Sequence, residues 1–258
     1  MNTIKIICFI LFVSVGSKLQ AQTSNEKFEQ ALKLKKELKY ESSFALFKEL
    51  LKIDSSNVEY LSNTGFLYAK IGYSLPTETQ KTNFYKTAEY LAKKAIALKR
   101  NNANAHYTYA FALGRLNENA STKQKIANAK LIKTECETAL QLDAKLAGCH
   151  HILGRWHRTV AGFSFLEKVT INTMFGGVPQ GGSYDEAIAE FQKALIIEPH
   201  YILHYYELAL SYYERNNKGD NRNAKTWAEK ALTLAPNPYD PDDAGTRKKC
   251  NDLLKKIK

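Results

Sequence analysis

The chain has 258 residues, enough for one large domain or two, and its 44% hydrophobic and 24% charged residues are typical of a folded protein. Its 13 glycines and 6 prolines exclude a collagen-like or linker-dominated chain, and its formal net charge is +11. After the first twenty residues, no apolar stretch is long enough to span a bilayer.

The N-terminus has the features of a secretory signal peptide. Lys5 precedes an apolar run over residues 6–15, and the small residue Ala21 stands before a candidate cleavage point. The run is shorter than the roughly 20 residues that a transmembrane helix needs. The pattern predicts that residues 1–21 are removed and that the protein is secreted or periplasmic; the alternative is a membrane-anchored protein with an uncleaved N-terminus. Cleavage would remove Lys5 and Lys18 and lower the net charge from +11 to +9.

Three cysteines follow this segment: Cys136, Cys149 and Cys250. No CxxC motif and no Cys/His spacing of a zinc site is present. Two interpretations stay open for an oxidising compartment. Cys136 and Cys149 are close enough in sequence to form a disulfide, or all three are buried free cysteines on helix faces, which is the interpretation that we favour.

Helical periodicity covers the chain from residue 23 onward, without the alternation typical of strands. Two consecutive segments repeat one spacing of small and apolar residues before a proline: Ala187, Phe191, Ala194 and Pro199, then Ala224, Ala228, Ala231 and Pro236. Small residues let paired helices approach closely, and the proline ends the second helix. This spacing resembles the tetratricopeptide repeat, a helical hairpin of about 34 residues. The resemblance implies an all-α fold, a right-handed tetratricopeptide-like helical-repeat solenoid.

One small residue marks the first helix of each of five units: Ala31, Gly65, Ala110, Gly154 and Ala209. Their separations of 34, 45, 44 and 55 residues exceed the repeat length by about three, three and six helical turns, which keeps the buried face in register. The first two insertions predict extended second helices that begin at the capping residues Thr77 and Ser121. The third insertion is residues 161–182. About five hairpins thus fill residues 22–241, and residues 242–258 are expected to form an amphipathic C-terminal capping helix.

The fourth unit carries a more specific signature. It combines HILGRW at residues 151–156, VAGFSFLEK at 160–168, MFG at 174–176 and SYDEA at 183–187. This combination resembles the regulator of microtubule dynamics family, closely over residues 146–236 and in outline before them. The resemblance implies association with microtubules or with phospholipids at organelle contacts. The chain departs from the family pattern at Gly181-Gly182, where Ser-Thr is usual, and at Phe165, where Trp is usual.

The insertion in the fourth unit contains four large apolar residues: Phe163, Phe165, Val169 and Phe175. If all four stayed exposed, they would form a patch larger than monomeric proteins usually show. We therefore expect them to fold back on the first helices of units four and five, close to Trp156.

Residue patterns for chemistry are sparse. The chain has no GxSxG, HExxH or phosphate-loop motif and no GxGxxG after a strand. His200 and His204 have a metal-compatible spacing but no third ligand nearby in sequence. The basic runs are typical of solvated helix faces. Because the chain has no nucleic-acid-binding motif, we do not expect a nucleic acid partner. The sequence predicts a non-enzymatic protein without cofactor or metal.

The concave face of the expected solenoid is the candidate binding site. One equivalent position of three successive first helices holds Lys36, Lys70 and Arg115, and Phe66 and Phe111 lie beside it. Further expected groove residues are Tyr107, His151, Arg155, Arg158, Tyr206 and Tyr213. Cations interleaved with aromatic rings attract an anion and offer it flat apolar contact. We expect an acidic peptide of a protein partner in this groove; the alternative is an anionic lipid or small anion, with the insertion forming part of its pocket.

Overall fold

The structure is a computed structural model that describes residues 23–175 and 177–257. The expected leader, residues 1–21, lies outside these ranges. Within them the chain is helical throughout and contains no strand. The first helix covers residues 23–36. The helices after it are α2 (Tyr40–Ile53), α3 (Val58–Gly72), α4 (Glu78–Leu98), α5 (Ala103–Leu116), α6 (Thr122–Leu142), α7 (Ala147–Ala161), α8 (Phe165–Met174), α9 (Tyr184–Ile197), α10 (Ile202–Arg215), α11 (Asp220–Thr233) and α12 (Asp243–Lys256), with a short 3-10 turn, η1 (Asn117–Asn119), after α5.

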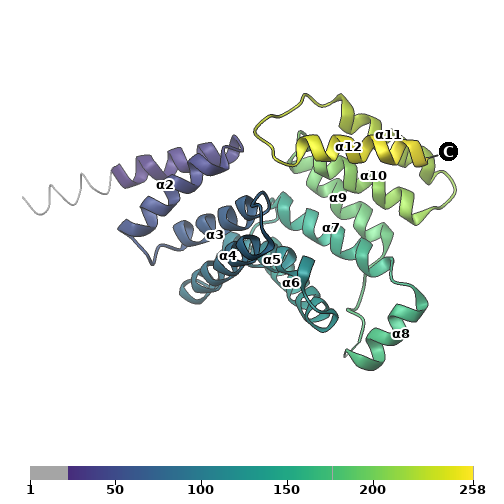
Figure 1. Cartoon of the computed structure of the whole chain (residues 1–258), viewed down its shortest axis with the longest axis horizontal. Coiled ribbons are helices and arrows are strands. Elements are labelled where there is room, and N and C mark those ends of the chain that lie inside the picture. The colour runs from purple at the N-terminus through teal and green to yellow at the C-terminus, as the bar shows by residue number, and fades with distance from the viewer. Residues whose placement is uncertain (1–22, 176, 258) are drawn as a thin grey trace, which may run out of the picture.

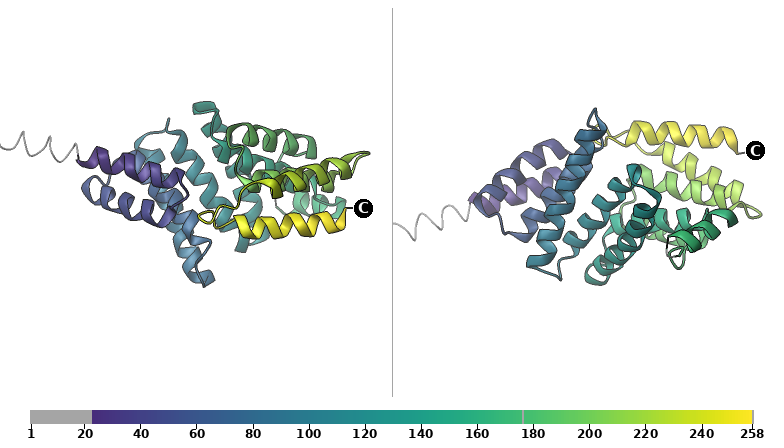
Figure 2. Two further views of the ribbon diagram at one scale, coloured as in Figure 1. Left: turned by 90° about the horizontal axis from the view of Figure 1, so that it is seen from above. Right: turned by 60° about the horizontal axis from the view of Figure 1, so that its bottom comes forward.

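The helices pair into five hairpins that stack into an arc (Figure 1). The pairs are the helix over residues 23–36 with α2, α3 with α4, α5 with α6, α7 with α9, and α10 with α11. Helix α8 lies within the fourth pair, and α12 packs on α10 and α11 (Figures 1 and 2). The predicted all-α repeat fold, with five hairpins and a capping helix, is confirmed. None of the helices in the described ranges combines the length and the hydropathy of a transmembrane segment.

The small residues of the first helices lie at helix contacts within and between the hairpins. A Cβ on Gly154 would come within 2.8 Å of the Phe191 ring, and a Cβ on Gly65 within 3.0 Å of the Thr108 side chain. The three alanines at the equivalent positions are fully buried. These positions therefore set how closely the first helices approach their neighbours, as the spacing predicted.

A second contact repeats in three first helices. His106, His150 and Tyr205 each lie four residues before the small residue of their helix, and the side chain of each contacts the backbone carbonyl oxygen of the residue six positions earlier. His106 Nε2 lies 2.8 Å from that oxygen, His150 Nε2 lies 3.3 Å from it, and the Tyr205 hydroxyl donates to it at 2.8 Å. Each contact ties the start of a first helix to the loop before it.

The extended second helices are present. α4 and α6 have 21 residues each, whereas α2, α9 and α11 have 14. Thr77 and Ser121 cap them by accepting hydrogen bonds from the backbone N–H groups of Gln80 and Gln124. The additional seven residues add about two helical turns, and the rest of each insertion lies in the connection before the helix.

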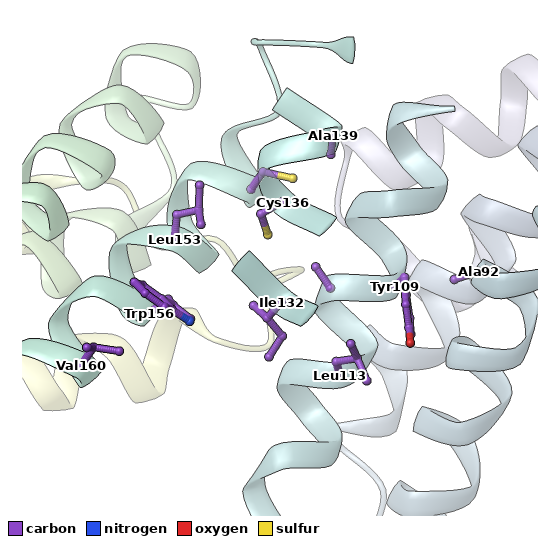
Figure 3. Packing of buried hydrophobic residues seen from close by; sticks show 11 residues of the cluster. Ala92, Tyr109, Leu113, Ile132, Cys136, Ala139, Leu153, Trp156 and Val160 are labelled. Carbon is purple, nitrogen blue, oxygen red and sulfur yellow. The ribbon is translucent and has the colours of Figure 1, made fainter. Parts of the chain in front are cut away.

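The hydrophobic core is continuous from α4 to α7 (Figure 3). Trp156 is buried in it and donates its indole N–H to the Ala129 carbonyl oxygen at 2.8 Å. Cys136, Cys149 and Cys250 are buried free thiols, so the alternative of a disulfide is not realised. Burial raises the pKa of the Cys136 thiol, which keeps it protonated.

The insertion differs from the expectation. It forms α8, and only two of its four apolar residues pack inward: Phe163 contacts the central core and Phe175 is half-buried. Phe165 is 83% exposed and Val169 is 41% exposed. The prediction that all four fold back was wrong because a single helix turns one face inward, and here Ile171 is the buried residue of α8.

A C-terminal strap, residues 234–242, connects α11 to α12. It runs back across the molecule to the N-terminal hairpins (Figures 1 and 2), where Lys39 Nζ lies 5.3 Å from the centre of the Tyr239 ring. The strap thus brings together segments that are about 200 positions apart in the sequence.

Candidate functional site

A groove of about 1550 Å³ lies along the first helices of the hairpins. Side chains of α3, α5, α7 and α10 line it, the C-terminal strap forms one wall, and α8 borders it. The position follows from the repeat, since the first helix of each hairpin lines the inner surface of such a solenoid.

Three aromatic rings form an apolar surface in this groove. The ring centres of Phe66 and Tyr107 are 5.7 Å apart, those of Phe66 and Phe111 5.4 Å, and those of Tyr107 and Phe111 6.1 Å. Burial raises the pKa of Tyr107 well above its ordinary value, so its hydroxyl stays protonated. The surface offers flat apolar contact next to charged groups.

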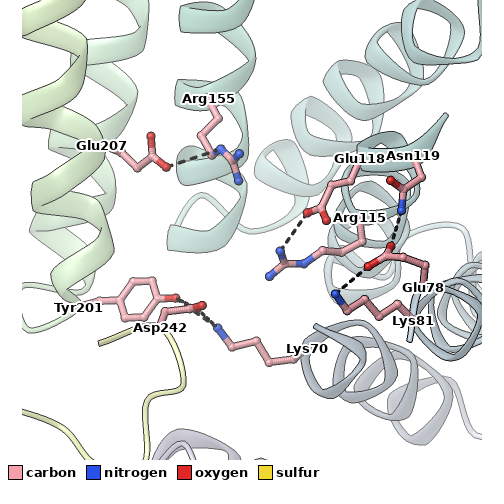
Figure 4. Close-up of polar contacts among 10 residues, drawn as sticks. All are labelled: Lys70, Glu78, Lys81, Arg115, Glu118, Asn119, Arg155, Tyr201, Glu207 and Asp242. Atoms are coloured by element: carbon pink, nitrogen blue, oxygen red, sulfur yellow. Dashed lines mark hydrogen bonds and ion pairs between the residues drawn. The ribbon is translucent and has the colours of Figure 1, made fainter. Parts of the chain in front are cut away.

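Lys70 is the most buried cation of the groove. Its Nζ lies 2.6 Å from Asp242 Oδ2 and 3.3 Å from the Tyr201 hydroxyl (Figure 4). The side chain of Lys70 is 7% exposed and that of Asp242 is 13% exposed. The lysine charge is therefore compensated by a carboxylate of the C-terminal strap.

Arg115 is less completely satisfied. Its guanidinium stacks on Tyr73 at 4.6 Å and on Phe111 at 5.2 Å, and Nη1 lies 3.3 Å from Glu118. Its Nε is buried and has no hydrogen-bond partner among the described residues. The contacts with the two rings fix the plane of the guanidinium.

Arg155 is an exposed cation of the groove, as are Lys36, Lys125 and Lys249. Its side chain is 56% exposed, and Nε lies 3.7 Å from Glu207 (Figure 4). Glu207 also pairs with Arg158. Because Glu207 already has a close partner in Arg158, the Arg155 guanidinium is only weakly engaged. Arg115 and Arg155 come from successive first helices, α5 and α7.

Two histidines form a pair in the groove wall. His151 Nδ1 and His204 Nδ1 are 2.9 Å apart, so one donates and the other accepts, and His204 Nε2 lies 3.2 Å from Glu198. Burial, followed by the neighbouring His204, lowers the pKa of His151 well below its ordinary value. His200 is exposed. Across the described ranges no three His, Cys, Asp or Glu side chains are grouped so that they could hold a metal ion.

Six of the nine residues proposed for ligand binding line the groove: Lys36, Lys70, Tyr107, Arg115, His151 and Arg155. Arg158, Tyr206 and Tyr213 do not line it. Arg158 is turned toward Glu207 between α7 and α10, and the two tyrosines pack in the cluster that α12 contributes to. The capping helix thus covers positions that are open in the earlier repeats.

The lining also includes eight acidic residues beside six lysines and arginines, so the groove is mixed in charge rather than predominantly basic. The acids that the sequence analysis missed include Glu207 on α10 and Asp240 and Asp242 of the strap. Burial raises the pKa of Asp240. The signal in the sequence was the acidic run after Pro238, but nothing local indicated that it folds onto α3.

Comparison with known proteins agrees with this fold. The profile of the family described as regulator of microtubule dynamics protein 1-3 matches residues 24–258. Regulator of microtubule dynamics protein 1 of Bos taurus is 32% identical over 155 residues, which are 60% of this chain and 47% of the bovine protein. Protein 2 of Rattus norvegicus is 29% identical over 194 residues, 74% of this chain and 46% of the rat protein. The matches thus span about half the length of these relatives.

A solved structure supports the architecture independently. A thermophilic TPR protein of Thermus thermophilus superimposes with a TM-score of 0.62 at 17% identity, over 90% of this chain and 98% of that chain. At this identity the likeness shows the fold. The profile match over nearly the whole described chain, on an all-helical repeat fold, shows that this protein belongs to the regulator of microtubule dynamics protein 1-3 family.

Proposed function

We propose that the protein is a non-enzymatic interaction scaffold that binds a segment of a protein partner in its groove, with acidic side chains of the partner held by Arg115 and Arg155. The observation that carries this proposal is the pair of incompletely satisfied guanidinium groups on successive first helices, beside a surface of aromatic rings. Such a surface suits a peptide in which acidic and apolar residues alternate.

Three acidic residues of the groove are already paired within the protein. Asp243 is paired with Arg247, Asp242 with Lys70, and Glu207 with Arg158. These acids are engaged within the protein, whereas Arg155 is exposed and one N–H of Arg115 has no partner within the described ranges.

A direct binding measurement tests the proposal. The probe is a fluorescein-labelled peptide of alternating Glu and Leu, with a peptide of alternating Lys and Leu as its charge-reversed counterpart. Arg115→Gln and Arg155→Gln should each weaken binding of the acidic probe about tenfold, the loss expected for one charge-assisted hydrogen bond. Arg222→Gln is the matched control, because Arg222 is exposed on α11 and outside the groove lining. Equal binding of both probes, or equal loss in all three variants, would contradict the proposal.

A lipid ligand is the second candidate, and one observation favours it. The part of the groove beside α8 is apolar, lined by Trp156, Phe163, Leu166, Ile171 and Phe175. An acyl chain could lie there while a phosphate group contacts Arg155. Organic extraction of the protein purified from its own cells, followed by mass spectrometry, distinguishes the candidates: a stoichiometric phospholipid would favour the lipid carrier over the peptide scaffold.

We also propose that the protein is exported after removal of residues 1–21. The support is the succession of Lys5, the apolar run over residues 6–15 and Ala21. The name of the relatives refers to microtubule dynamics, but an exported chain would not meet cytoplasmic microtubules, so our proposal adopts the fold of the family and not this activity. N-terminal sequencing of the purified protein tests export: a chain that starts at Gln22 is expected, and a chain that retains Lys5 would contradict it.

A further inference from the structure

Asp242 has an unusual position for an aspartate that precedes a helix. It is the N-cap residue of α12, where a carboxylate commonly accepts hydrogen bonds from the first backbone N–H groups of the helix. The Asp242 side chain makes no such bond. It turns away from its own helix to Lys70 Nζ at 2.6 Å and to the Tyr201 hydroxyl at 3.2 Å. The carboxylate therefore contacts Lys70, which is 172 residues away in the sequence, and not the backbone of its own helix.

Lys70 is held inside the groove by two aromatic rings and one carboxylate. Lys70 Nζ also lies over the rings of Tyr40 at 5.4 Å and Tyr201 at 5.7 Å. Asp242 is the carboxylate that forms an ion pair with Lys70 in the described part of the chain. Burial raises the pKa of Asp242, but its interactions with Lys70 outweigh burial and hold the pKa below the ordinary value, so the carboxylate is charged.

Within the strap, Asp240 is buried and accepts a hydrogen bond from the Asp242 backbone N–H at 3.0 Å, whereas the residues beside it are exposed. Tyr239 is 56% exposed and contacts Lys39 through its ring face, while Pro241 is exposed. Strap residues Asn237, Asp240, Pro241 and Asp242 all line the groove. The segment therefore lies where an acidic peptide passing Lys70 would lie.

We propose that the C-terminal strap is a built-in competitor: Asp242 occupies the Lys70 subsite that an acidic side chain of the partner takes, and binding of the partner displaces the strap. This inference rests on the proposed function, since it requires that the groove binds an acidic segment. It adds Lys70 to Arg115 and Arg155 as a cation that holds the partner, and access to Lys70 then depends on the strap.

A tethered competitor lowers the apparent affinity of a ligand by the fraction of molecules in which the subsite is free. A short tether also keeps the competing group at an effective concentration of about millimolar or more. If the strap is displaced in about one molecule in ten, removal of the competing charge raises the affinity about tenfold.

Asp242→Asn tests the proposal, because it removes the charge of the competitor and preserves its size. The probe is again the labelled peptide of alternating Glu and Leu, and the control is Asp252→Asn. Asp252 is also paired with a lysine, Lys248 at 2.7 Å, on the same helix but outside the groove, so both variants change the net charge equally. We expect about tenfold tighter binding for Asp242→Asn and unchanged binding for Asp252→Asn.

A second variant and a second readout separate competition from a general change in charge or folding. Tyr239→Ala loosens the strap without altering any charge and should also tighten binding. In the wild-type protein, saturating peptide should accelerate amide hydrogen exchange in residues 237–242. Wild-type binding of the peptide without tighter binding by Asp242→Asn or Tyr239→Ala would overturn the competitor and leave the proposed function intact. Failure of all three proteins to bind the peptide would overturn both.

Discussion

Gly154 is the residue at which the fourth hairpin closes, and it offers a sharp test of the repeat packing. A Cβ at this position would lie 2.8 Å from the Phe191 ring, whereas a Cβ on Gly114 would have no atom within 4 Å. Gly154→Ala should lower the free energy of unfolding by about 1–3 kcal/mol through overpacking. Gly114→Ala should raise it by about 0.5–1 kcal/mol, because alanine favours the helix. Urea unfolding measures both, and a gain in stability for Gly154→Ala would contradict the close approach.

Lys35 provides a pH-dependent test. Burial lowers the pKa of its ammonium to about 8 in the folded protein, where Nζ lies 2.5 Å from Asn63 Oδ1. Between that value and the ordinary pKa of 10.5, the unfolded chain binds more protons than the folded one. The free energy of unfolding should therefore rise with pH in this window. Urea unfolding of the wild type and of Lys35→Met at pH 8 and pH 9.5 measures the difference, and identical pH dependence of the two proteins would show that Lys35 is not the source.

Single residues also show what the sequence reveals and what it does not. The small residues of the first helices follow from spacing alone, since every hairpin needs close approach at the same position. The groove positions of Lys36, Lys70 and Arg115 follow from the same register. The partner of Lys70 could not be predicted, because Asp242 is 172 residues away and reaches it through an irregular segment without a periodic pattern.

At the level of helices, the extended α4 and α6 were predictable because capping residues mark their starts, whereas the environment of α8 was not. An apolar periodicity indicates that a helix has an apolar face, but it does not say which residues of the face find a neighbour. Ile171 is buried in α8, while Phe165 and Leu166 are exposed.

This difference gives a prediction for α8. Phe165→Ala should change the free energy of unfolding by no more than about 0.5 kcal/mol, as for an exposed residue. Phe191→Ala is the comparison, because Phe191 is fully buried against Gly154 and its truncation should cost about 3–5 kcal/mol. Chemical denaturation compares the two variants, and a loss of several kcal/mol for Phe165→Ala would mean that α8 packs against the body of the protein more closely than in this structure.

For the molecule as a whole, the order of the hairpins could be predicted from the sequence, but the position of the strap as a wall of the groove could not. Hairpin order follows from the chain because each unit contacts its neighbours. The position of the strap, residues 234–242, depends on the curvature of the five stacked hairpins, which decides whether the strap can reach α3. For the same reason, the covering of Tyr206 and Tyr213 by α12 is visible only in the structure.

Photo-crosslinking within the native cell shows whether the groove holds a segment of a protein partner. Benzoylphenylalanine at position 159 would replace Thr159, which is exposed and lines the groove. The control position is Tyr90, which is 64% exposed and lies outside the groove lining. We predict adducts at position 159, absent at position 90, that map to an acidic stretch of one partner protein. Adducts with lipid alone, or the same adducts at both positions, would mean that the groove does not bind a segment of a protein partner.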